Sequence, residues 1–394
     1  MTLLSVEEAQ QRLIASAPTL GLENPPLAET IGRWLADDVL ALRDQPWTAL
    51  SAMDGYAIRH QDLPGPWTII GESAAGNLTP QLIEQSEAVR IFTGAPMPDG
   101  ADCVLVQEEA ALEGTKLLLA GEGPAAPSKN VRKQGSDFST GAKLLEKGSL
   151  IGAPQVAIAA LGGHGTLPVR RKLRVAIFTT GNELTEPGQQ IHAGELPASN
   201  SLMLRAMLSH LPVTIQDLGI VRDNLEAQVQ SFATAANADI IVTTGGASVG
   251  DHDLIKPAFE AAGGSLDFWR IALRPGKPLM AGRNGNALFL GLPGNPVSAF
   301  VTATLFLLPL VRHMGGSQHP LPQLIKARLT EDMPPVAARA VYVRAIMSEG
   351  TVRPLADQDS AGMAALSSAN ALIVRPQKAP AVQAGEMVKC LPID

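Results

Sequence analysis

The sequence predicts a multi-domain α/β protein whose largest domain is a doubly wound, mostly parallel sheet. The chain of 394 residues is longer than one ordinary hydrophobic core supports, so two to four domains are expected. Between residues 172 and 316, apolar strand-like runs alternate with helix-like segments, a pattern typical of parallel α/β sheets. The flanking segments differ in the spacing of their apolar residues. They predict a helical domain, an inserted β-rich domain and a C-terminal β-barrel-like domain.

The helical domain is predicted from residues 1–42 and 141–171. Ser5 and Glu8 form a capping box that starts a helix, and the acidic N-terminus does not resemble a signal peptide. Helical spacing returns over residues 142–162, so the β-rich region is expected to be inserted between two flanks of one domain. Apolar residues also keep a helical spacing further along the first flank, at Leu27, Ile31, Leu35 and Val39.

The two β domains are predicted from residues 43–140 and 317–394. The first contains short apolar runs such as "WTII", "AVRIF" and "CVLVQ", separated by Gly, Pro, Asn and Asp. The second contains the strand-like runs "LIKARL", "VYVRAI", "ALIVRP" and "EMVKCLPI", which predict a small barrel or sandwich.

The α/β domain is predicted from residues 172–316. Strands are expected at 173–178, 214–220, 238–242, 267–273 and 287–291. Helices are expected at 201–210, 224–237, 254–263 and 296–308. The apolar stretch 297–311 is shorter than the ~20 residues that span a bilayer and contains Pro309, so it predicts a buried helix and no membrane partner.

Composition limits the classes of function. Hydrophobic residues make up 45% of the chain and charged residues 18%, as in a soluble globular protein, and the net charge of −7 argues against nucleic acid as a partner. The only two cysteines, Cys103 and Cys390, are far apart in sequence, which argues against a disulfide framework or a cysteine zinc site. A reducing cytoplasmic location is therefore expected.

Ligands of a doubly wound sheet bind at the carboxyl ends of its strands, so the loops there are the candidate site. "TTGNEL" (179–184) and "TTGGASVGDHD" (243–253) each follow a predicted strand with hydroxyls, glycine and carboxylates. Such loops offer backbone N–H groups to phosphate and carboxylates to Mg²⁺, although each alone is also compatible with an ordinary glycine turn. Neither is a Walker or GxGxxG sequence.

Two further loops follow strands of the same sheet. "RPGKP" (274–278) places Arg274 and Lys277 around a Pro-Gly turn, which favours an anionic ligand over a solvated turn. "LPGNP" (292–296) turns into a helix, and a rigid connection is as good an interpretation as a ligand contact.

Taken together, these motifs resemble the molybdopterin molybdenumtransferase family, the bacterial relatives of the gephyrin E domain. The four loops occur in family order with "SAMDGYA", "IFTGAPMPDGAD", "NVRKQGSD" and "SANALIV", and they extend over nearly the whole chain. The resemblance implies an elongated homodimer of four-domain subunits with a molybdopterin-binding α/β domain. It implies an enzyme that inserts molybdate into the dithiolene of adenylylated molybdopterin and hydrolyses the adenylate with Mg²⁺, releasing AMP.

The resemblance also implies site residues. Asp253 and Glu183 match the family's acidic residues and would be catalytic and hold Mg²⁺, and Asp54 would be catalytic. The substrate-binding residues would be Thr93, Gly245, Gly246, Ser248, Lys256, Arg274, Lys277, Pro293, Asn295 and Arg344. The implied site is composite, with Asp54 of one subunit facing Asp253 of the other. A molybdopterin adenylyltransferase would be the substrate donor.

The chain departs from the family pattern at three places. Asn182 replaces the aspartate of the usual TGDEL, Ala198 replaces an aspartate, and Ala364 and Ala365 replace a hydroxyl-rich stretch. These losses of polar groups leave open a scaffold or regulatory paralogue that binds molybdopterin with weakened catalysis. A molybdopterin adenylyltransferase, which shares the sheet type and a TGG loop, is the second alternative; the additional domains argue against it.

Overall fold

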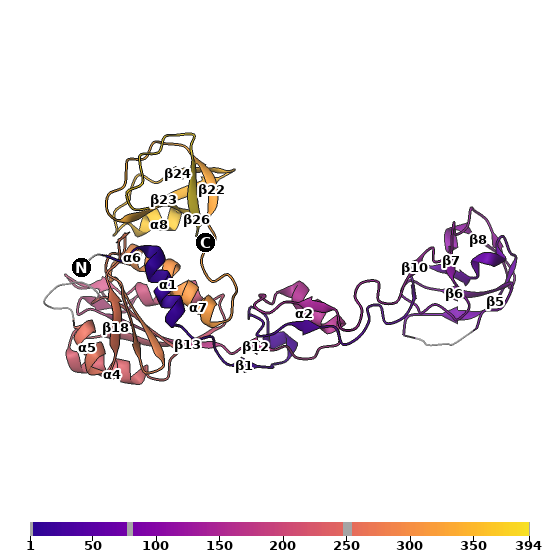
Figure 1. Ribbon diagram of the computed structural model, residues 1–394, viewed down its shortest axis with the longest axis horizontal. Helices are drawn as coiled ribbons and strands as arrows, with labels where there is room; N and C mark the ends of the chain where they lie inside the picture. Colours follow the sequence, from indigo (N-terminus) through magenta and orange to yellow (C-terminus); the bar gives the residue numbers. More distant parts are fainter. Residues whose placement is uncertain (1–2, 77–81, 247–253, 394) are drawn as a thin grey trace.

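The structure is a computed structural model that describes residues 3–76, 82–246 and 254–393. The molecule is elongated (Figure 1). The α/β domain and the C-terminal β domain lie together at one end, and the inserted β-rich domain lies at the other. A narrow middle segment that carries β1, β12 and α2 connects them.

The α/β domain contains a six-stranded sheet of order β16-β13-β17-β21-β20-β18. The first four strands are parallel, and β20 alone runs antiparallel to its neighbours β21 and β18, which confirms a mostly parallel sheet. The strands are β13 (Leu173–Thr180), β16 (Val213–Val221), β17 (Ile240–Thr244), β18 (Ser265–Trp269), β20 (Met280–Asn284) and β21 (Ala287–Leu292).

Helices cover both faces of this sheet because its central strands are apolar on both sides. In β13, Val175 and Ile177 face a core shared with α1, α3 and the α6–α7 helix, whereas Phe178 faces a core shared with α4 and α5. The helices are α1 (Val6–Ser16), α3 (Asn200–Leu208), α4 (Leu225–Thr234), α5 (Ile255–Ala261), α6 (Pro296–Thr302) and α7 (Leu308–Met314).

The predicted strand 267–273 is wrong as one element. The chain turns at Arg270, whose φ is +78°, and only β18 belongs to the α/β sheet. The following pair, β19 (Leu273–Arg274), joins the C-terminal domain by pairing with β23 (Ala340–Ser348). Strand β20 was not predicted.

The helix after β21 is longer than predicted. It runs from Pro296 to Met314 through a π-helical segment at Ala303–Leu307, and by length and composition it is able to cross a membrane. However, 78% of its most apolar window is buried inside the protein. The prediction of a buried helix is confirmed; the prediction that it is too short for a membrane is wrong.

The N-terminal flank is less helical than predicted. Ser5 caps α1 as predicted by accepting a hydrogen bond from the Glu8 N–H, whereas the Glu8 carboxylate accepts a hydrogen bond from Arg12. Residues 27–39 do not continue the helix, because they follow two prolines and Gly32 has a φ of +76°. Moreover, α1 packs against the α/β domain. The middle segment consists of two short strand pairs, β1–β12 and β2–β11, and the helix α2 (Ala153–Leu161).

Both β domains contain six-stranded sheets. The inserted sheet has the order β7-β4-β6-β5-β9-β8. In the C-terminal domain, β23-β24-β22-β26-β25 closes into a barrel because β23 also pairs with β25. The remaining strands are β1 (Leu22–Glu23), β2 (Val39–Leu40), β3 (Leu50–Ser51), β4 (Gly55–Ile58), β5 (Trp67–Ser73), β6 (Glu87–Ile91), β7 (Cys103–Val106), β8 (Ala110–Glu113), β9 (Lys116–Leu119), β10 (Val131–Arg132), β11 (Lys143–Leu145), β12 (Val169–Arg170), β14 (Leu184–Thr185), β15 (Leu196–Pro197), β22 (Ile325–Leu329), β24 (Thr351–Pro354), β25 (Ala371–Arg375) and β26 (Met387–Pro392).

Candidate active site

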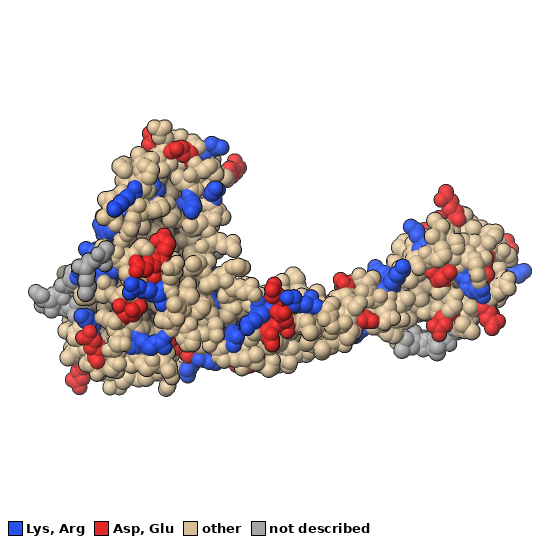
Figure 2. Space-filling model, in the orientation of Figure 1, with Lys and Arg blue, Asp and Glu red and all other residues tan. Residues whose placement is uncertain are grey.

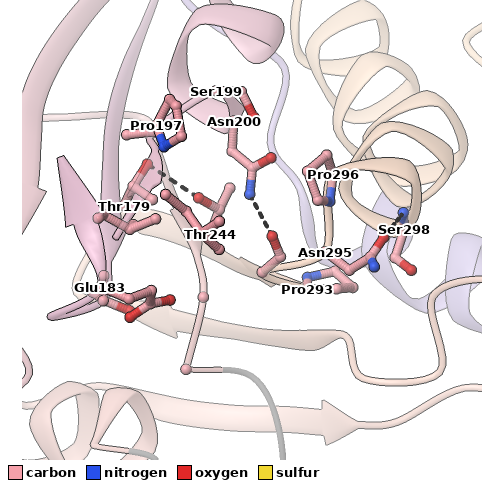
Figure 3. A pocket seen from close by; sticks show the side chains of 18 of the residues that line it. Thr179, Glu183, Pro197, Ser199, Asn200, Thr244, Pro293, Asn295, Pro296 and Ser298 are labelled. Atoms are coloured by element: carbon pink, nitrogen blue, oxygen red, sulfur yellow. Dashed lines mark hydrogen bonds between the residues drawn. The ribbon is translucent and has the colours of Figure 1, made fainter. Parts of the chain in front are cut away.

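A cavity of about 530 Å³ lies at the carboxyl ends of β13, β17 and β21 (Figure 3). Parallel pairing brings Thr179 opposite Thr244 and Thr244 opposite Leu292, so the three loops that follow meet at one edge of the sheet. The cavity lining contains five residues predicted from sequence, Glu183, Gly245, Gly246, Pro293 and Asn295. Ser248 and Asp253 lie outside the described residues.

Glycine is required where these loops approach one another. Gly245 has a φ of +93°, and a Cβ atom there would lie 2.4 Å from the carbonyl oxygen of Thr180. A Cβ atom on Gly294 would lie 3.2 Å from the Cα atom of Gly245. The sequence "TTGG" therefore allows the loop after β17 to pass directly over the end of β13, which leaves backbone groups facing the cavity.

Two buried polar atoms at the cavity have no hydrogen-bond partner among the described residues. They are Thr180 Oγ1 and Asn200 Oδ1. The Asn200 amide donates a 2.8 Å hydrogen bond to the carbonyl oxygen of Gly294, so its side chain is fixed with Oδ1 unpaired (Figure 3). Buried polar groups are normally paired, so two unpaired atoms at one cavity are available to a ligand or water.

Asp223 is the functional candidate that the sequence reasoning missed. It follows β16, lines the cavity with Glu183, and is joined to Asn182 by two hydrogen bonds of 3.1 Å. Asn182 N–H donates to Asp223 Oδ2, and Asp223 N–H donates to Asn182 Oδ1. The only signal in the sequence is its position just after a strand of the parallel sheet, because "VRDN" contains no glycine.

Asp223 is partly buried and feels the negative charge of Glu183. Burial, and then the nearby charge of Glu183, raise the pKa of Asp223, while the hydrogen bond from Asn182 acts against them. A carboxylate pair in this arrangement is stabilised by a divalent cation. Mg²⁺ typically uses one or two carboxylates together with substrate phosphate oxygens, so Glu183 and Asp223 fit this ion. Among the residues that the structure describes, no group of three or more His, Cys, Asp or Glu side chains forms a metal cluster.

A second cavity, of about 490 Å³, lies between the α/β domain and the C-terminal barrel. Its basic lining residues are Arg274, Lys277, Arg339 and Arg344, and it shares Pro278 and Ser298 with the first cavity. The "RPGKP" loop reaches this position because β19 pairs with β23 of the barrel. An anionic ligand that spans both cavities would thus contact a cation held by Glu183 and Asp223 in the first cavity. In the second cavity it would contact Arg274 and Lys277.

Arg344 differs from the other three basic residues of this cavity. It is only 2% exposed, and its guanidinium donates hydrogen bonds of 2.8 Å to Gly362 O and 2.7 Å to Asp359 O. Burial lowers its pKa, and the charges of Asp357 and Asp359 act in the opposite direction. Arg344 therefore holds the loop that precedes α8 (Met363–Ser368), which carries Ala364 and Ala365.

Three predicted residues lie away from both cavities. Lys256 lies on α5, where its ammonium group is 3.9 Å from Glu260 and 5.4 Å from the centre of the Trp269 ring. Asp54 and Thr93 lie in the inserted β domain at the far end of the molecule (Figure 1). There, Asp54 Oδ1 accepts hydrogen bonds of 2.7 Å from Thr93 N and 2.8 Å from Thr93 Oγ1, which lower the pKa of Asp54.

Comparison with known proteins relates all parts of the chain to one family. Three family models match: the MoeA N-terminal region (domain I and II) at residues 4–163, a probable molybdopterin binding domain at residues 176–313, and the MoeA C-terminal region (domain IV) at residues 326–393.

Individual relatives agree with these matches. The molybdopterin molybdenumtransferase of Haemophilus influenzae is 33% identical, covering 100% of this chain and 99% of its own, and that of Staphylococcus aureus is 32% identical, covering 98% and 94%. The crystal structure of the molybdopterin biosynthesis MoeA protein from Pyrococcus horikoshii OT3 matches 100% of both chains with a TM-score of 0.84 and 28% identity.

Proposed function

The chain belongs to the molybdopterin molybdenumtransferase (MoeA) family, and from that premise we propose how its two adjacent cavities perform the reaction. The protein is an enzyme of molybdenum cofactor biosynthesis that inserts molybdenum into molybdopterin. The proposal concerns the form of the substrate, the metal and the assembly of the site. The observation that carries it is the carboxylate pair Glu183 and Asp223 next to the basic residues Arg274 and Lys277.

The substrate in this proposal is adenylylated molybdopterin, delivered by a molybdopterin adenylyltransferase. Its phosphates lie along the glycine-rich edge of the sheet, where they can approach the backbone of Gly245 and Gly246 closely. Glu183, Asp223 and Asp253 would hold Mg²⁺, which would neutralise phosphate charge. Water then attacks the adenylyl phosphorus and forms a new P–O bond, while the bond from this phosphorus to the bridging oxygen breaks. The products are AMP and the molybdopterin phosphate, which keeps the bridging oxygen, and the two protons of the water pass to solvent.

Arg274 and Lys277 bind the molybdate dianion in the second cavity. Both side chains are exposed and make no ion pair with a described residue, so they are free to contact an oxyanion. Pro278 and Ser298 border both cavities, which allows molybdate to wait within reach of the dithiolene while the adenylate occupies the sheet edge. Electrostatic positioning of this kind is the main contribution expected from the protein.

The direct test measures turnover of purified protein with adenylylated molybdopterin, molybdate and Mg²⁺. We expect loss of substrate, release of AMP and formation of molybdenum cofactor, all abolished in Glu183→Ala. Glu186→Ala, three residues along the same segment but outside the cavity lining, is the matched control. Binding of substrate with no AMP release by wild type at any Mg²⁺ concentration would instead support the scaffold alternative.

We also propose that the active enzyme is a homodimer with composite sites. Asp54 and Thr93 are too far from the sheet edge of their own chain to complete its site (Figure 1). In addition, the narrow middle segment exposes many large apolar side chains, which monomers rarely gather on a small module. They are Leu22, Ile31, Leu40, Leu42, Leu150 and Leu161, each between 47% and 61% exposed. Symmetric pairing through this segment would cover them.

Complementation tests the composite site. Asp54→Ala and Glu183→Ala homodimers are each expected to be inactive, whereas their heterodimer contains one doubly damaged site and one intact site. Its activity should be roughly half that of wild type for two independent sites. Inactive heterodimers made from folded, dimeric single variants would refute the composite site, because Asp54 and Glu183 would then have to serve the same chain. A nucleic-acid partner is not proposed, because acidic and basic side chains are interspersed over the visible face (Figure 2). A cytoplasmic location stays a prediction.

A further inference from the structure

A third cavity lies in the C-terminal barrel, next to the second cavity. Its volume is about 380 Å³, and the connection between β22 and β23 forms much of its wall. Three guanidinium groups line it, and no aspartate or glutamate does. They belong to Arg274, Arg339 and Arg375. Three like charges around one small space repel one another unless an anion neutralises them.

Arg375 is the most buried of these three arginines. It ends β25 opposite Val341 and is only 3% exposed. Its Nη2 donates hydrogen bonds to the carbonyl oxygens of Pro334 and Pro380, but its Nη1 has no partner among the described residues. Burial lowers the pKa of Arg375, and no carboxylate acts against this effect. A buried cation without a counter-charge is unfavourable, and an anion in the adjoining cavity compensates it.

The other two arginines are free to contact a ligand. Arg274 is exposed and Arg339 half-buried, and neither makes a side-chain hydrogen bond or ion pair with a described residue. Both also line the second cavity, so the third cavity continues the basic surface outward along β23.

The remaining walls are apolar. Met333, Val336, Val341 and Val343 line the space together with two prolines and two alanines. An inorganic oxyanion would fill only a small part of about 380 Å³ and would leave these walls without contact. A ligand that carries both a charged oxyanion and an apolar body matches both kinds of surface.

We propose that this third cavity binds an organic phosphate monoester, with the phosphate near the three guanidinium groups and the organic body against the apolar walls. A dianionic phosphate suits three positive charges better than a single carboxylate does. The nucleoside monophosphate AMP is the natural candidate. That choice rests on the proposed function, in which AMP is the released product, whereas the class of ligand rests on the cavity alone.

Isothermal titration of the full-length dimer with AMP, adenosine and inorganic phosphate tests this site without turnover. We expect AMP to bind more tightly than either fragment. Arg375→Met removes the buried charge while keeping an apolar side chain of similar length, and it should weaken AMP binding at least tenfold, or about 1.4 kcal/mol. Arg353→Met, an exposed arginine of β24 that does not line the cavity, is the matched control and should leave the affinity unchanged.

A second variant covers the case in which Arg375→Met does not fold. Val336→Trp fills the cavity from the half-buried β22–β23 connection and does not alter the second cavity. It should also weaken AMP binding at least tenfold. AMP affinity equal to wild type in the folded variants would overturn the proposal, as would inorganic phosphate that binds as tightly as AMP. A protein with no AMP release but with Arg375-dependent AMP binding would refute the proposed reaction and keep this site.

Discussion

Replacing Asn182 with aspartate restores the family's acidic residue at the cavity and tests how the site uses its carboxylates. In the structure, Asn182 Oδ1 accepts a 3.1 Å hydrogen bond from Asp223 N–H. An aspartate oxygen accepts the same bond, so the backbone of the two loops should not move. The change adds one negative charge next to Asp223, whose pKa the charge of Glu183 already raises.

The size of the effect follows from the separation and exposure of these groups. Two unit charges about 4 Å apart repel by about 1 kcal/mol in a water-like environment. Because Asn182 is exposed and Asp223 only half-buried, this lower limit of the range applies. We therefore expect the free energy of unfolding of Asn182→Asp to fall by about 1 kcal/mol in a chelator. The same energy favours a bound cation, so the Mg²⁺ concentration for half-maximal activity should fall roughly fivefold.

The pH dependence provides an independent check. The pKa of Asp223 is raised by burial and by Glu183, and a third carboxylate raises it further. A carboxyl group with a raised pKa in the folded state contributes stability below its unfolded pKa, and this contribution is lost as pH rises through the folded pKa. The destabilisation of Asn182→Asp should therefore be largest near neutral pH and disappear below about pH 4.

Urea unfolding with and without Mg²⁺, together with AMP release, measures these quantities. Asn182→Ala is the control, because it removes the acceptor of the Asp223 N–H and should lower activity without lowering the Mg²⁺ requirement. An unchanged Mg²⁺ requirement in Asn182→Asp, with Asn182→Ala as active as wild type, would refute a role of this segment in holding the cation.

Three further changes test the fold and the site. Asp239 is 7% exposed and accepts two hydrogen bonds of 2.7 Å from Arg171. Asp239→Asn should lower the unfolding free energy by about 2 kcal/mol. Although burial acts to raise the pKa of Asp239, the arginine hydrogen bonds lower it overall. The difference from wild type should thus be present above about pH 4 and close as pH falls through the lowered folded pKa. Gly245→Ala should abolish AMP release, because its Cβ atom would clash with the end of β13. The control Gly188→Ala, at a φ of +89° and with open space around it, should lower the melting temperature only through backbone strain and should keep AMP release. Lys277→Ala should raise the KM for molybdate about tenfold without lowering the melting temperature, because Lys277 is exposed and holds no other side chain; an unchanged KM would remove it from the molybdate site.

The sequence predicts the central sheet and its ligand edge because both are encoded locally. Strands β13, β17 and β21 are mostly apolar, and a glycine-containing loop follows each of them. These features fix neighbouring parallel strands, and parallel strands bring their loops to one edge. The positions of Glu183 and Gly245 follow directly.

The features that escaped prediction depend on pairing between distant segments. Leu273 and Arg274 leave the α/β sheet to pair with Ala340 and Val341 of the barrel, which no local pattern indicates. Asp223 belongs to the site only because β16 pairs beside β13. In the N-terminal flank, the helical spacing of apolar residues is overridden by prolines and by pairing of β2 with β11, more than a hundred residues later.

The hydrogen bonding of Asp54 bears on what a composite site requires of the distant domain. Both of its hydrogen bonds from Thr93 end on Oδ1, and Oδ2 accepts none from the described residues. The bonds hold the carboxylate in one orientation and keep its pKa low, so the group is ionised at neutral pH with one oxygen uncommitted. A carboxylate that only stabilised its own loop would gain from using both oxygens. An oriented, charged and half-used carboxylate at the far end of an elongated chain is instead suited to a ligand or cation that another chain holds. This arrangement requires that Thr93→Val, which removes one of the two bonds, impair the Asp54-dependent step while leaving the inserted domain folded.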